Sequence, residues 1–301
     1  MKLKRIIVLG PTPNNDQKSR LKVLGEVKFL SSPKSSIDLV KATQGADVLY
    51  SDGAFLLKSL PKLKNIFVTY PYVELGVFNS NTLNKNGVIV ANAQGGNRAS
   101  IIEWVMYMVL SLFRKFRPLV RVSKNIEVKM RESLVDKKVL IIGKGSIGSK
   151  IAISCKAFGM KVDFFERGDD LYEKAKDADI IINALNCNSS SKNLLDEKFF
   201  MSLKKGSYFV TFVRPYTYDI DGLLKAIDNE VVAGAGIDCD PEDFGDTTNS
   251  FYQKCLGIEK VLVTPHIAFS TKQAITNGEE IAIRNIEAFI KGNPQNVLTK
   301  T

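Results

Sequence analysis

Residues 138–167, KVLIIGKGSIGSKIAISCKAFGMKVDFFER, constrain the fold more than any other stretch of the chain. The stretch begins with a short apolar run without alternation, residues 139–142, which is typical of a strand buried on both faces. Gly143, Gly145 and Gly148 follow as G-x-G-x-x-G and open a helix. The first glycine allows the bend, the second lets a pyrophosphate approach the backbone, and the third lets the helix pack close to the strand. The stretch therefore predicts a βαβ unit that binds a dinucleotide.

The choice of cofactor depends on the ends of this unit. Backbone N–H groups at Ser146 and Ile147 would face the phosphates, because a helix N-terminus has free N–H groups and a positive dipole end. Glu166 ends the second predicted strand, where an acid can accept hydrogen bonds from the ribose hydroxyls. Arg167 could meet a 2′-phosphate, but Glu166 would repel it. The pattern therefore predicts NAD rather than NADP as the cofactor.

Composition narrows the class of protein. The chain has 301 residues, of which 45% are hydrophobic and 25% charged, an ordinary composition for one large or two medium domains. The apolar run near the N-terminus is too short for a signal peptide, and residues 104–113 are too short to span a bilayer. The cysteines are scattered without a C-x-x-C pair, at Cys155, Cys187, Cys239 and Cys255. We therefore expect a cytoplasmic protein with no metal site and no membrane partner.

The net charge is +10, from 42 basic and 32 acidic residues. A basic surface can attract nucleic acid, an anionic membrane or an acidic substrate. Here the lysines are spread over the whole chain and form no long basic run. The pattern favours a solvated basic surface first and steering of small anions second, and no nucleic-acid partner is expected.

The first 92 residues repeat a strand-then-helix rhythm, with strand candidates at 5–10, 26–30, 46–51, 65–69 and 87–90. They carry no nucleotide fingerprint, because prolines stand at positions 11 and 13, where a phosphate loop needs N–H groups. Residues 99–115 predict the strongest helix of the chain. Residues 117–135 predict a connecting helix and loop.

After Arg167 the alternation continues, with predicted strands at 178–185, 207–212, 231–237 and 260–264. Together with the two strands of the dinucleotide unit they make a doubly wound parallel sheet. A long helix, 272–291, follows after this sheet is complete. We expect it to pack against the first domain, which needs cover.

Three side chains stand just beyond carboxyl ends of the predicted strands, where ligands bind in such sheets. Arg214 follows one strand, and its planar fork suits a carboxylate. Asp238, with Glu242 and Asp243 close behind, follows the next. His266, the only histidine of the chain, follows the last. A lone histidine is more often structural, but this position opposite a carboxylate cluster favours proton transfer near neutral pH.

Four ordered segments resemble the D-isomer-specific 2-hydroxyacid dehydrogenase family, which includes phosphoglycerate, glycerate, lactate, glyoxylate and formate dehydrogenases. They are 91–97 followed by Glu103, 210–214 followed by Asp219, 236–243, and 264–267. The resemblance covers nearly the whole chain. It implies a doubly wound parallel-sheet Rossmann NAD domain at 93–276. It also implies a smaller flavodoxin-like α/β substrate domain at 1–92, to which 277–301 return.

The resemblance also implies roles for individual residues. In reduction of a 2-keto acid by NADH, His266 would donate the proton and Arg214 would bind the carboxylate and polarise the carbonyl. Asp243, or its neighbour Glu242, would hold His266 protonated, and Asp238 would bind the nicotinamide carboxamide. Substrate contacts are expected from Arg214 and from first-domain residues, namely Ser51, Asp52, Gly53, Tyr70 and Tyr72. The family's members are usually dimers through the NAD domain.

The resemblance leaves two functions open. The first is an NAD-dependent enzyme that interconverts a 2-keto acid and a D-2-hydroxy acid, with glyoxylate and hydroxypyruvate as first candidate substrates. Tyr70 and Tyr72 admit a bulkier acid, and the basic surface leaves phosphorylated acids open. The second is an NAD(H)-sensing, corepressor-like binding protein on the same scaffold. Pro71 departs from the family pattern, because it removes an N–H from a loop that usually holds the substrate carboxylate.

Overall fold

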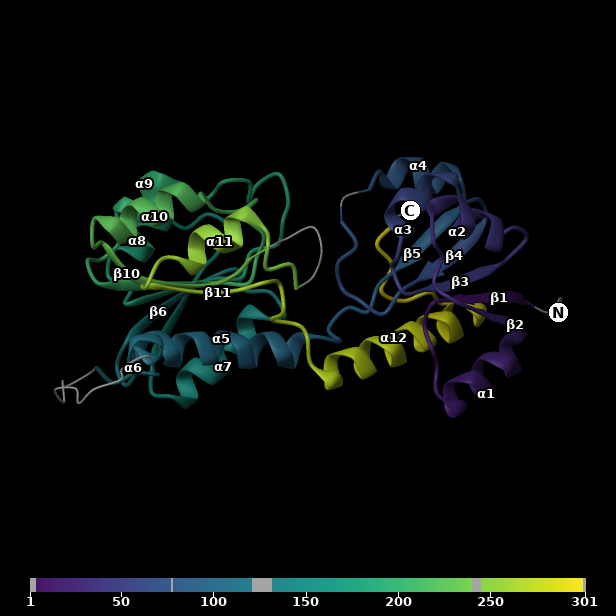
Figure 1. Cartoon of the computed structure of the whole chain (residues 1–301), viewed down its shortest axis with the longest axis horizontal. Coiled ribbons are helices and arrows are strands. Elements are labelled where there is room, and N and C mark those ends of the chain that lie inside the picture. The colour runs from purple at the N-terminus through teal and green to yellow at the C-terminus, as the bar shows by residue number, and fades with distance from the viewer. Residues whose placement is uncertain (1–3, 77, 121–131, 240–244, 300–301) are drawn as a thin grey trace. The chain divides into compact units, whose positions relative to one another are not determined.

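The computed structural model describes residues 4–76, 78–120, 132–239 and 245–299. The chain divides into two compact units (Figure 1). Unit 1 contains Met1–Asn97 and Ser270–Thr301, and unit 2 contains Arg98–Phe269. Both units are parallel α/β sheets covered by helices, which confirms the predicted fold class. Among the described residues, no helix has both the length and the apolar character needed to cross a membrane.

Unit 1 has a five-stranded parallel sheet in the flavodoxin-like order β2-β1-β3-β4-β5. Its strands are β1 (Lys4–Leu9), β2 (Gly25–Leu30), β3 (Val48–Ser51), β4 (Ile66–Thr69) and β5 (Val88–Ala91). Its helices are α1 (Asn15–Leu24), α2 (Ser36–Ala42), α3 (Leu56–Ser59), α4 (Ser80–Lys85) and α12 (Lys272–Ile290), with a 3-10 turn η1 (Leu60–Lys62).

The strands of unit 1 bury alternate residues on opposite faces, as the pleat requires. Ile6 and Val8 of β1 lie in one hydrophobic cluster, and Ile7 and Leu9 lie in another. Figure 1 shows α1 and α12 on one face of this sheet and α2, α3 and α4 on the other. The final helix α12 therefore covers a face of the first domain, although about 180 residues separate its start from the end of β5 in sequence.

A buried asparagine fastens α12 to the sheet of unit 1. The Asn285 side chain is fully buried, and its Nδ2 donates to Thr69 Oγ1 at 3.2 Å and to the Asn92 carbonyl at 2.9 Å. Its Oδ1 accepts from Asn296 Nδ2 at 2.9 Å. The rings of Phe67 and Phe289 stack beside it at a centroid distance of 4.4 Å. These contacts join the C-terminal segment to β4 and to the residue that follows β5.

Unit 2 has a six-stranded parallel sheet in the order β11-β10-β9-β8-β6-β7. Its strands are β6 (Lys138–Ile142), β7 (Lys161–Phe165), β8 (Ile180–Asn183), β9 (Ser207–Thr211), β10 (Val232–Asp238) and β11 (Val261–Thr264). Its helices are α5 (Arg98–Phe113), α6 (Phe116–Val120), α7 (Gly148–Ala157), α8 (Leu171–Ala175), α9 (Glu197–Met201), α10 (Ile220–Asp228) and α11 (Ser250–Leu256). The chain passes from β6 to β7 on one side of β6 and then crosses over to β8 on the other side, so the strand order reverses beside β6.

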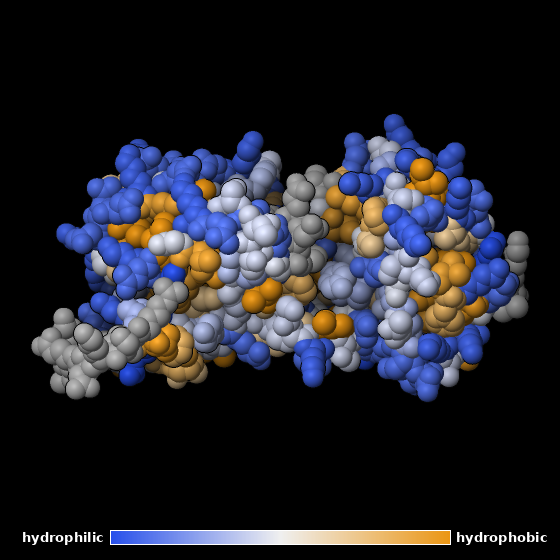
Figure 2. All heavy atoms as spheres, in the orientation of Figure 1, coloured by the Kyte–Doolittle hydropathy of each residue, from blue (hydrophilic) through white to orange (hydrophobic). Residues whose placement is uncertain are grey.

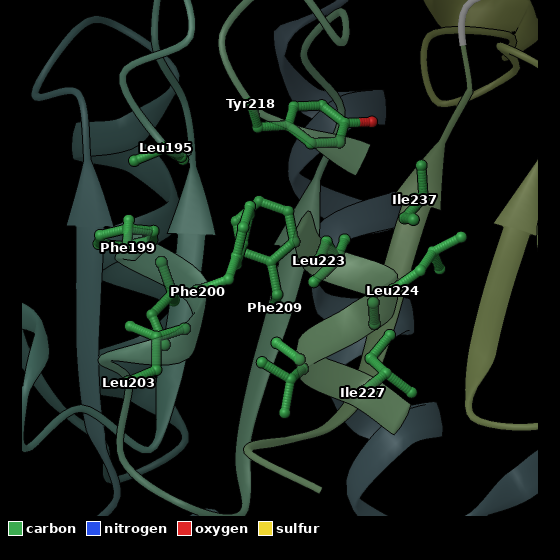
Figure 3. Close-up of a cluster of buried hydrophobic side chains, with 14 of the residues drawn as sticks. Leu195, Phe199, Phe200, Leu203, Phe209, Tyr218, Leu223, Leu224, Ile227 and Ile237 are labelled. Carbon is green, nitrogen blue, oxygen red and sulfur yellow. The ribbon is translucent and has the colours of Figure 1, made fainter. Parts of the chain in front are cut away.

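Helices cover both faces of the unit 2 sheet. Figure 1 shows α5 and α7 on one face and α8, α9, α10 and α11 on the other. Figure 3 shows α9 and α10 pointing apolar side chains at the sheet, where Phe200 meets Phe209 edge-on at a centroid distance of 5.1 Å. Cover on both faces explains why these strands are continuous apolar runs in the sequence.

The strongest predicted helix ends earlier than expected. The sequence predicts a helix over 99–115, but α5 ends at Phe113, and Lys115 has a positive φ of 50°. A residue in this left-handed conformation stops the helical hydrogen-bond ladder. The predicted connecting helix begins as α6, and residues 121–131 lie outside the described part of the chain.

Candidate active site

Three adjacent strands of unit 2 bring the predicted chemical groups to one edge of the sheet. β9, β10 and β11 are neighbours, and all run in the same direction. Arg214 follows β9, Asp238 ends β10, and His266 follows β11. The candidate residues of unit 2 therefore stand at the carboxyl edge of the sheet, the usual place for ligands in such folds.

Asp238 organises this edge with a buried carboxylate that is 4% exposed. Its Oδ1 accepts from Thr264 Oγ1 at 2.6 Å and from the backbone N–H of Ile267 at 2.9 Å. Its Oδ2 accepts from the N–H of Ala268 at 2.8 Å. Burial raises the pKa of the Asp238 carboxyl above its ordinary value, and these hydrogen bonds and nearby His266 oppose the rise.

His266 lies in the loop that Asp238 fastens. Its φ is +57°, a conformation that residues with a side chain rarely adopt. Its backbone N–H donates to the Thr264 carbonyl at 3.1 Å, and its half-buried ring meets Phe269 edge-on at 5.9 Å. The tight turn and the carboxylate contacts therefore fix the direction in which the imidazole leaves the backbone.

The Arg214 loop is held by the preceding strands. The Arg214 carbonyl accepts from the Thr217 N–H at 3.2 Å, which closes a turn. The buried Asn183 side chain, at the end of β8, donates to Thr217 Oγ1 at 2.9 Å and to Thr211 Oγ1 at 3.2 Å. The sequence analysis missed Asn183. In the sequence, Asn183 is recognisable as a polar residue that ends the apolar run of β8 at the same edge of the sheet.

The sequence predicts two candidates for the acid beside His266. Glu242 and Asp243 lie outside the described residues. The hydrogen bonds of Asp238 hold the loop after β11 in place. Its predicted contact with the nicotinamide carboxamide stays a prediction.

The glycine turn after β6 has the form that a dinucleotide needs. A Cβ on Gly143, whose φ is +113°, would lie 2.5 Å from the Ala184 carbonyl oxygen, and one on Gly148 would lie 2.0 Å from the Gly143 carbonyl oxygen. Both positions therefore exclude any side chain. A Cβ on Gly145 would meet nothing within 4 Å. The turn is thus closed toward β8 and open at the second glycine, the position at which such turns admit the pyrophosphate of a dinucleotide. Ser146 and Ile147 lead directly into α7.

Glu166 has an unexpected partner within this turn. Its Oε1 lies 2.7 Å from Nζ of Lys144, the residue between the first two glycines. The same ammonium group is 5.4 Å from the centre of the Phe164 ring. Arg167 is exposed beside Glu166. The acid that is expected to meet the ribose hydroxyls therefore carries a lysine as counter-ion, a feature that the spacing argument did not reveal.

Apart from Arg214, the predicted substrate residues belong to unit 1, where they end β3 or follow β3 and β4. Buried Ser51 accepts from the Gly53 N–H at 3.1 Å through its hydroxyl. Asp52 accepts from Ser32 Oγ at 2.5 Å and from the Ala54 N–H at 2.9 Å.

The two predicted tyrosines differ in exposure. Tyr72 is half-buried, and a Cβ on Gly53 would lie 3.8 Å from its ring. The Tyr70 side chain is fully buried, and its hydroxyl has no hydrogen-bond partner among the residues that the structure describes. Tyr72, Gly53 and Asp52 therefore form one group on the β3 and β4 loops, whereas Tyr70 lies in the core beside it.

Glu279 joins this group, and the sequence analysis missed it. It lies on α12 next to Gly278, where a Cβ would come within 2.0 Å of the Pro71 carbonyl oxygen, so the helix rests on the loop after β4. Burial raises the pKa of Tyr50 and of Tyr72, and the charge of Glu279 adds to the rise in each. Glu279 occupies the same helix stripe as Ile283 and Ile286, which face the sheet. Only the packing of α12 on unit 1 reveals this position.

Comparisons with known proteins agree with the fold and with the nucleotide turn. Residues 106–268, more than half of the chain, match the model of the D-isomer specific 2-hydroxyacid dehydrogenase family's NAD binding domain. This match confirms the predicted class of cofactor.

Curated relatives and a solved structure extend the comparison. The chain is 33% identical over 232 residues to a D-3-phosphoglycerate dehydrogenase of Bacillus subtilis, a match that covers 70% of this chain and only 42% of that protein. It is 26% identical over 292 residues to a D-lactate dehydrogenase of Staphylococcus aureus, with 88% of each chain covered. The structure of an acyclic imino acid reductase in complex with NADPH and D-Arg superposes with a TM-score of 0.82 at 19% identity, over 98% of this chain and 99% of that one.

The ion pair at Glu166 generates a testable prediction. Replacing Lys144 with Met removes the counter-ion, so the Glu166 carboxylate repels a 2′-phosphate more strongly. We expect the ratio of the NADPH to the NADH dissociation constant to rise about fivefold, which corresponds to an exposed charge interaction of about 1 kcal/mol. Titration of each nucleotide by its fluorescence measures both constants.

Lys150→Met, an exposed lysine on α7, is the matched control for loss of one positive charge. A ratio that stays unchanged in Lys144→Met, or that rises equally in the control, would contradict this explanation of cofactor choice.

Proposed function

The chain belongs to the D-isomer specific 2-hydroxyacid dehydrogenase family, and on this premise we propose that it interconverts a 2-keto acid and a D-2-hydroxy acid with NAD. One observation carries the proposal: Arg214, Asp238 and His266 follow or end three adjacent parallel strands. A cation for a carboxylate and a proton donor then stand at the edge of the sheet that also carries the nucleotide turn.

The residues of unit 2 have distinct proposed roles. When bound, NADH supplies the reducing equivalent to the carbonyl carbon. Arg214 binds the substrate carboxylate with its planar guanidinium and polarises the carbonyl. His266 donates the proton that the developing alkoxide requires. Asp243, with Glu242 as the alternative, holds His266 in its protonated form.

Replacement of His266 with Asn tests the proton-donor role. Asparagine tolerates the positive φ at this position, so the loop should keep its form. We expect kcat for reduction of a 2-keto acid to fall about 10²- to 10⁴-fold, while the dissociation constant for NADH changes less than about twofold. Steady-state kinetics and nucleotide titration measure the two quantities.

A His266→Asn variant that keeps most of the wild-type kcat would remove His266 from the mechanism. If the unmutated protein binds NADH but reduces no member of a broad 2-keto acid panel, the NAD(H)-sensing, corepressor-like alternative is favoured instead.

The substrate, we propose, has one carboxylate and no second negative charge. Asp52 and Glu279 place carboxylates on the proposed substrate domain, and neither has an ion pair within the described part of the chain. Pro71 supplies no N–H to the loop between them. Such a surface disfavours dicarboxylic and phosphorylated acids. Glyoxylate and hydroxypyruvate remain the first candidates, and neutral or cationic side chains are compatible.

A substrate panel with a charge-removing variant tests this selection. We expect kcat/KM for 2-ketoglutarate to lie below that for pyruvate. The ratio of kcat/KM for 2-ketoglutarate to kcat/KM for pyruvate should rise about fivefold in Glu279→Gln, as for an interaction of about 1 kcal/mol. Glu26→Gln, at an exposed glutamate on β2, removes the same charge elsewhere in unit 1 and should leave the ratio unchanged. Equal ratios in wild type and Glu279→Gln would refute the role of Glu279.

The partner, we propose, is a second copy of this chain, bound through unit 2. Large apolar side chains are exposed on α5 and α7 and beside them: Tyr107, Val135, Ile153 and Phe158. Figure 2 shows that hydrophobic residues reach the surface at several places on both units. Exposed apolar surface of this kind is typical of protein interfaces.

Light scattering tests the dimer. We expect the wild type to have twice the 33.4 kDa chain mass and Ile153→Asp to dissociate toward a single chain. Ile153 is 60% exposed, and Ile37 on α2 of unit 1 is 58% exposed, so Ile37→Asp is a matched control that should keep the dimer mass. A wild type with the mass of one chain would exclude the proposed interface.

A further inference from the structure

A hydrogen-bonded chain of three side chains, buried at both ends and half-buried at Thr264, links α5 to the loop that carries His266. The indole Nε1 of Trp104 donates to Thr264 Oγ1 at 3.1 Å. The Thr264 hydroxyl donates to Asp238 Oδ1 at 2.6 Å. Trp104 is 9% exposed and Asp238 is 4% exposed, so water competes little for these groups.

The chemistry of the three groups fixes the direction of this chain. An indole N–H can only donate, and an ionised carboxylate can only accept. The Thr264 hydroxyl therefore accepts from Trp104 and must point its own proton at Asp238. A hydroxyl polarised by a donor is a stronger donor itself, which helps keep a buried carboxylate charged.

Glycines in β10 set the height of Trp104 above the sheet. A Cβ on Gly236 would lie 2.9 Å from Met108 Cβ, and one on Gly234 would lie 3.3 Å from Leu112 Cδ2. Residues four apart on a helix are about 6 Å apart along its axis, and residues two apart on a strand are about 6.6 Å apart. Leu112 packs against Gly234 and Met108 against Gly236. By the same spacing Trp104, four residues before Met108, lies beside Asp238, two residues after Gly236.

The position of the Asp238 carboxylate determines the position of the backbone beside His266. Asp238 accepts from the backbone N–H groups of Ile267 and Ala268, the two residues directly after His266. These bonds act on a turn in which His266 itself has a φ of +57°. A change in the position of the carboxylate would therefore turn the peptide groups that orient the imidazole.

We propose that Trp104 and Thr264 are positioning residues for His266, which act by holding the Asp238 carboxylate in place. The inference rests on the proposed function, because it assumes that His266 transfers the proton. Neither residue needs to touch the substrate. The fold supplies the sole tryptophan and the sole histidine of the chain as reporters at the two ends of this network.

An isosteric pair of variants separates the hydroxyl from the methyl group. Thr264→Val removes the hydroxyl and keeps the shape, whereas Thr264→Ser keeps the hydroxyl. We expect Thr264→Val to lower kcat about tenfold or more, as a small misplacement of a catalytic group does, with KM for the keto acid nearly unchanged. Thr264→Ser should recover most of kcat, and Trp104→Phe should lower kcat less than Thr264→Val.

Two spectroscopic readouts work without turnover. In untagged Thr264→Val the emission of Trp104 should move to shorter wavelength, because the indole loses its acceptor. The C2–H proton signal of His266 should move in the NMR spectrum of Thr264→Val and stay near its wild-type position in Thr264→Ser. If the wild type reduces no 2-keto acid, the proposed function fails, and the His266 signal still tests the positioning network.

Thr43→Val is the matched control for loss of a buried hydroxyl. Thr43 lies in unit 1, where its hydroxyl donates to the carbonyls of Leu39 and Val40. The control should lose stability without changing kcat or the His266 signal. The proposal is overturned if Thr264→Val behaves like this control, or if Thr264→Ser loses as much activity as Thr264→Val.

Discussion

The buried carboxylate of Asp238 is the constraint on which the candidate site depends. It ends β10 and binds β11 and the following loop through Thr264, Ile267 and Ala268. An unpaired carboxylate at 4% exposure would be costly, and three hydrogen bonds offset that cost. The loop is therefore ordered because the charge must be satisfied, and the placement of His266 follows from the same requirement.

In unit 1 a buried amide without charge, that of Asn285, has a role similar to that of the Asp238 carboxylate. Asn285 meets a strand-end hydroxyl, a backbone carbonyl and the Asn296 side chain in a fully buried position. Each of these buried polar groups, if left without a hydrogen-bond partner, would lower the stability of the fold by about 1–3 kcal/mol. α12 is thereby fixed in rotation as well as in position. Since Glu279 stands on the same helix, this buried amide also determines where that carboxylate lies on unit 1.

The sequence predicted what local periodicity and turn chemistry encode. The final helix was predicted at 272–291 and is Lys272–Ile290, and the six strands after residue 137 all occur, because buried strands are uninterrupted apolar runs. Contacts between distant segments were not predictable in this way. Lys144 meets Glu166 and Trp104 meets Thr264 only after the sheet is assembled, and no spacing rule relates them. The positive φ of His266 likewise follows from its loop contacts and not from its residue type.

The sequence also carries a local signal at the ends of its strands. Several strands end in a polar residue that accepts from the backbone N–H two positions later: Ser51 from Gly53, Asn183 from Leu185, and Thr211 from Val213. Such side chains replace the strand ladder with a turn at the point where the ladder stops. Asp238 performs the same task across two strands. A polar residue directly after a buried apolar run is thus a sign of where the chain is being turned toward a site, and it identifies positions that a search for reactive side chains passes over.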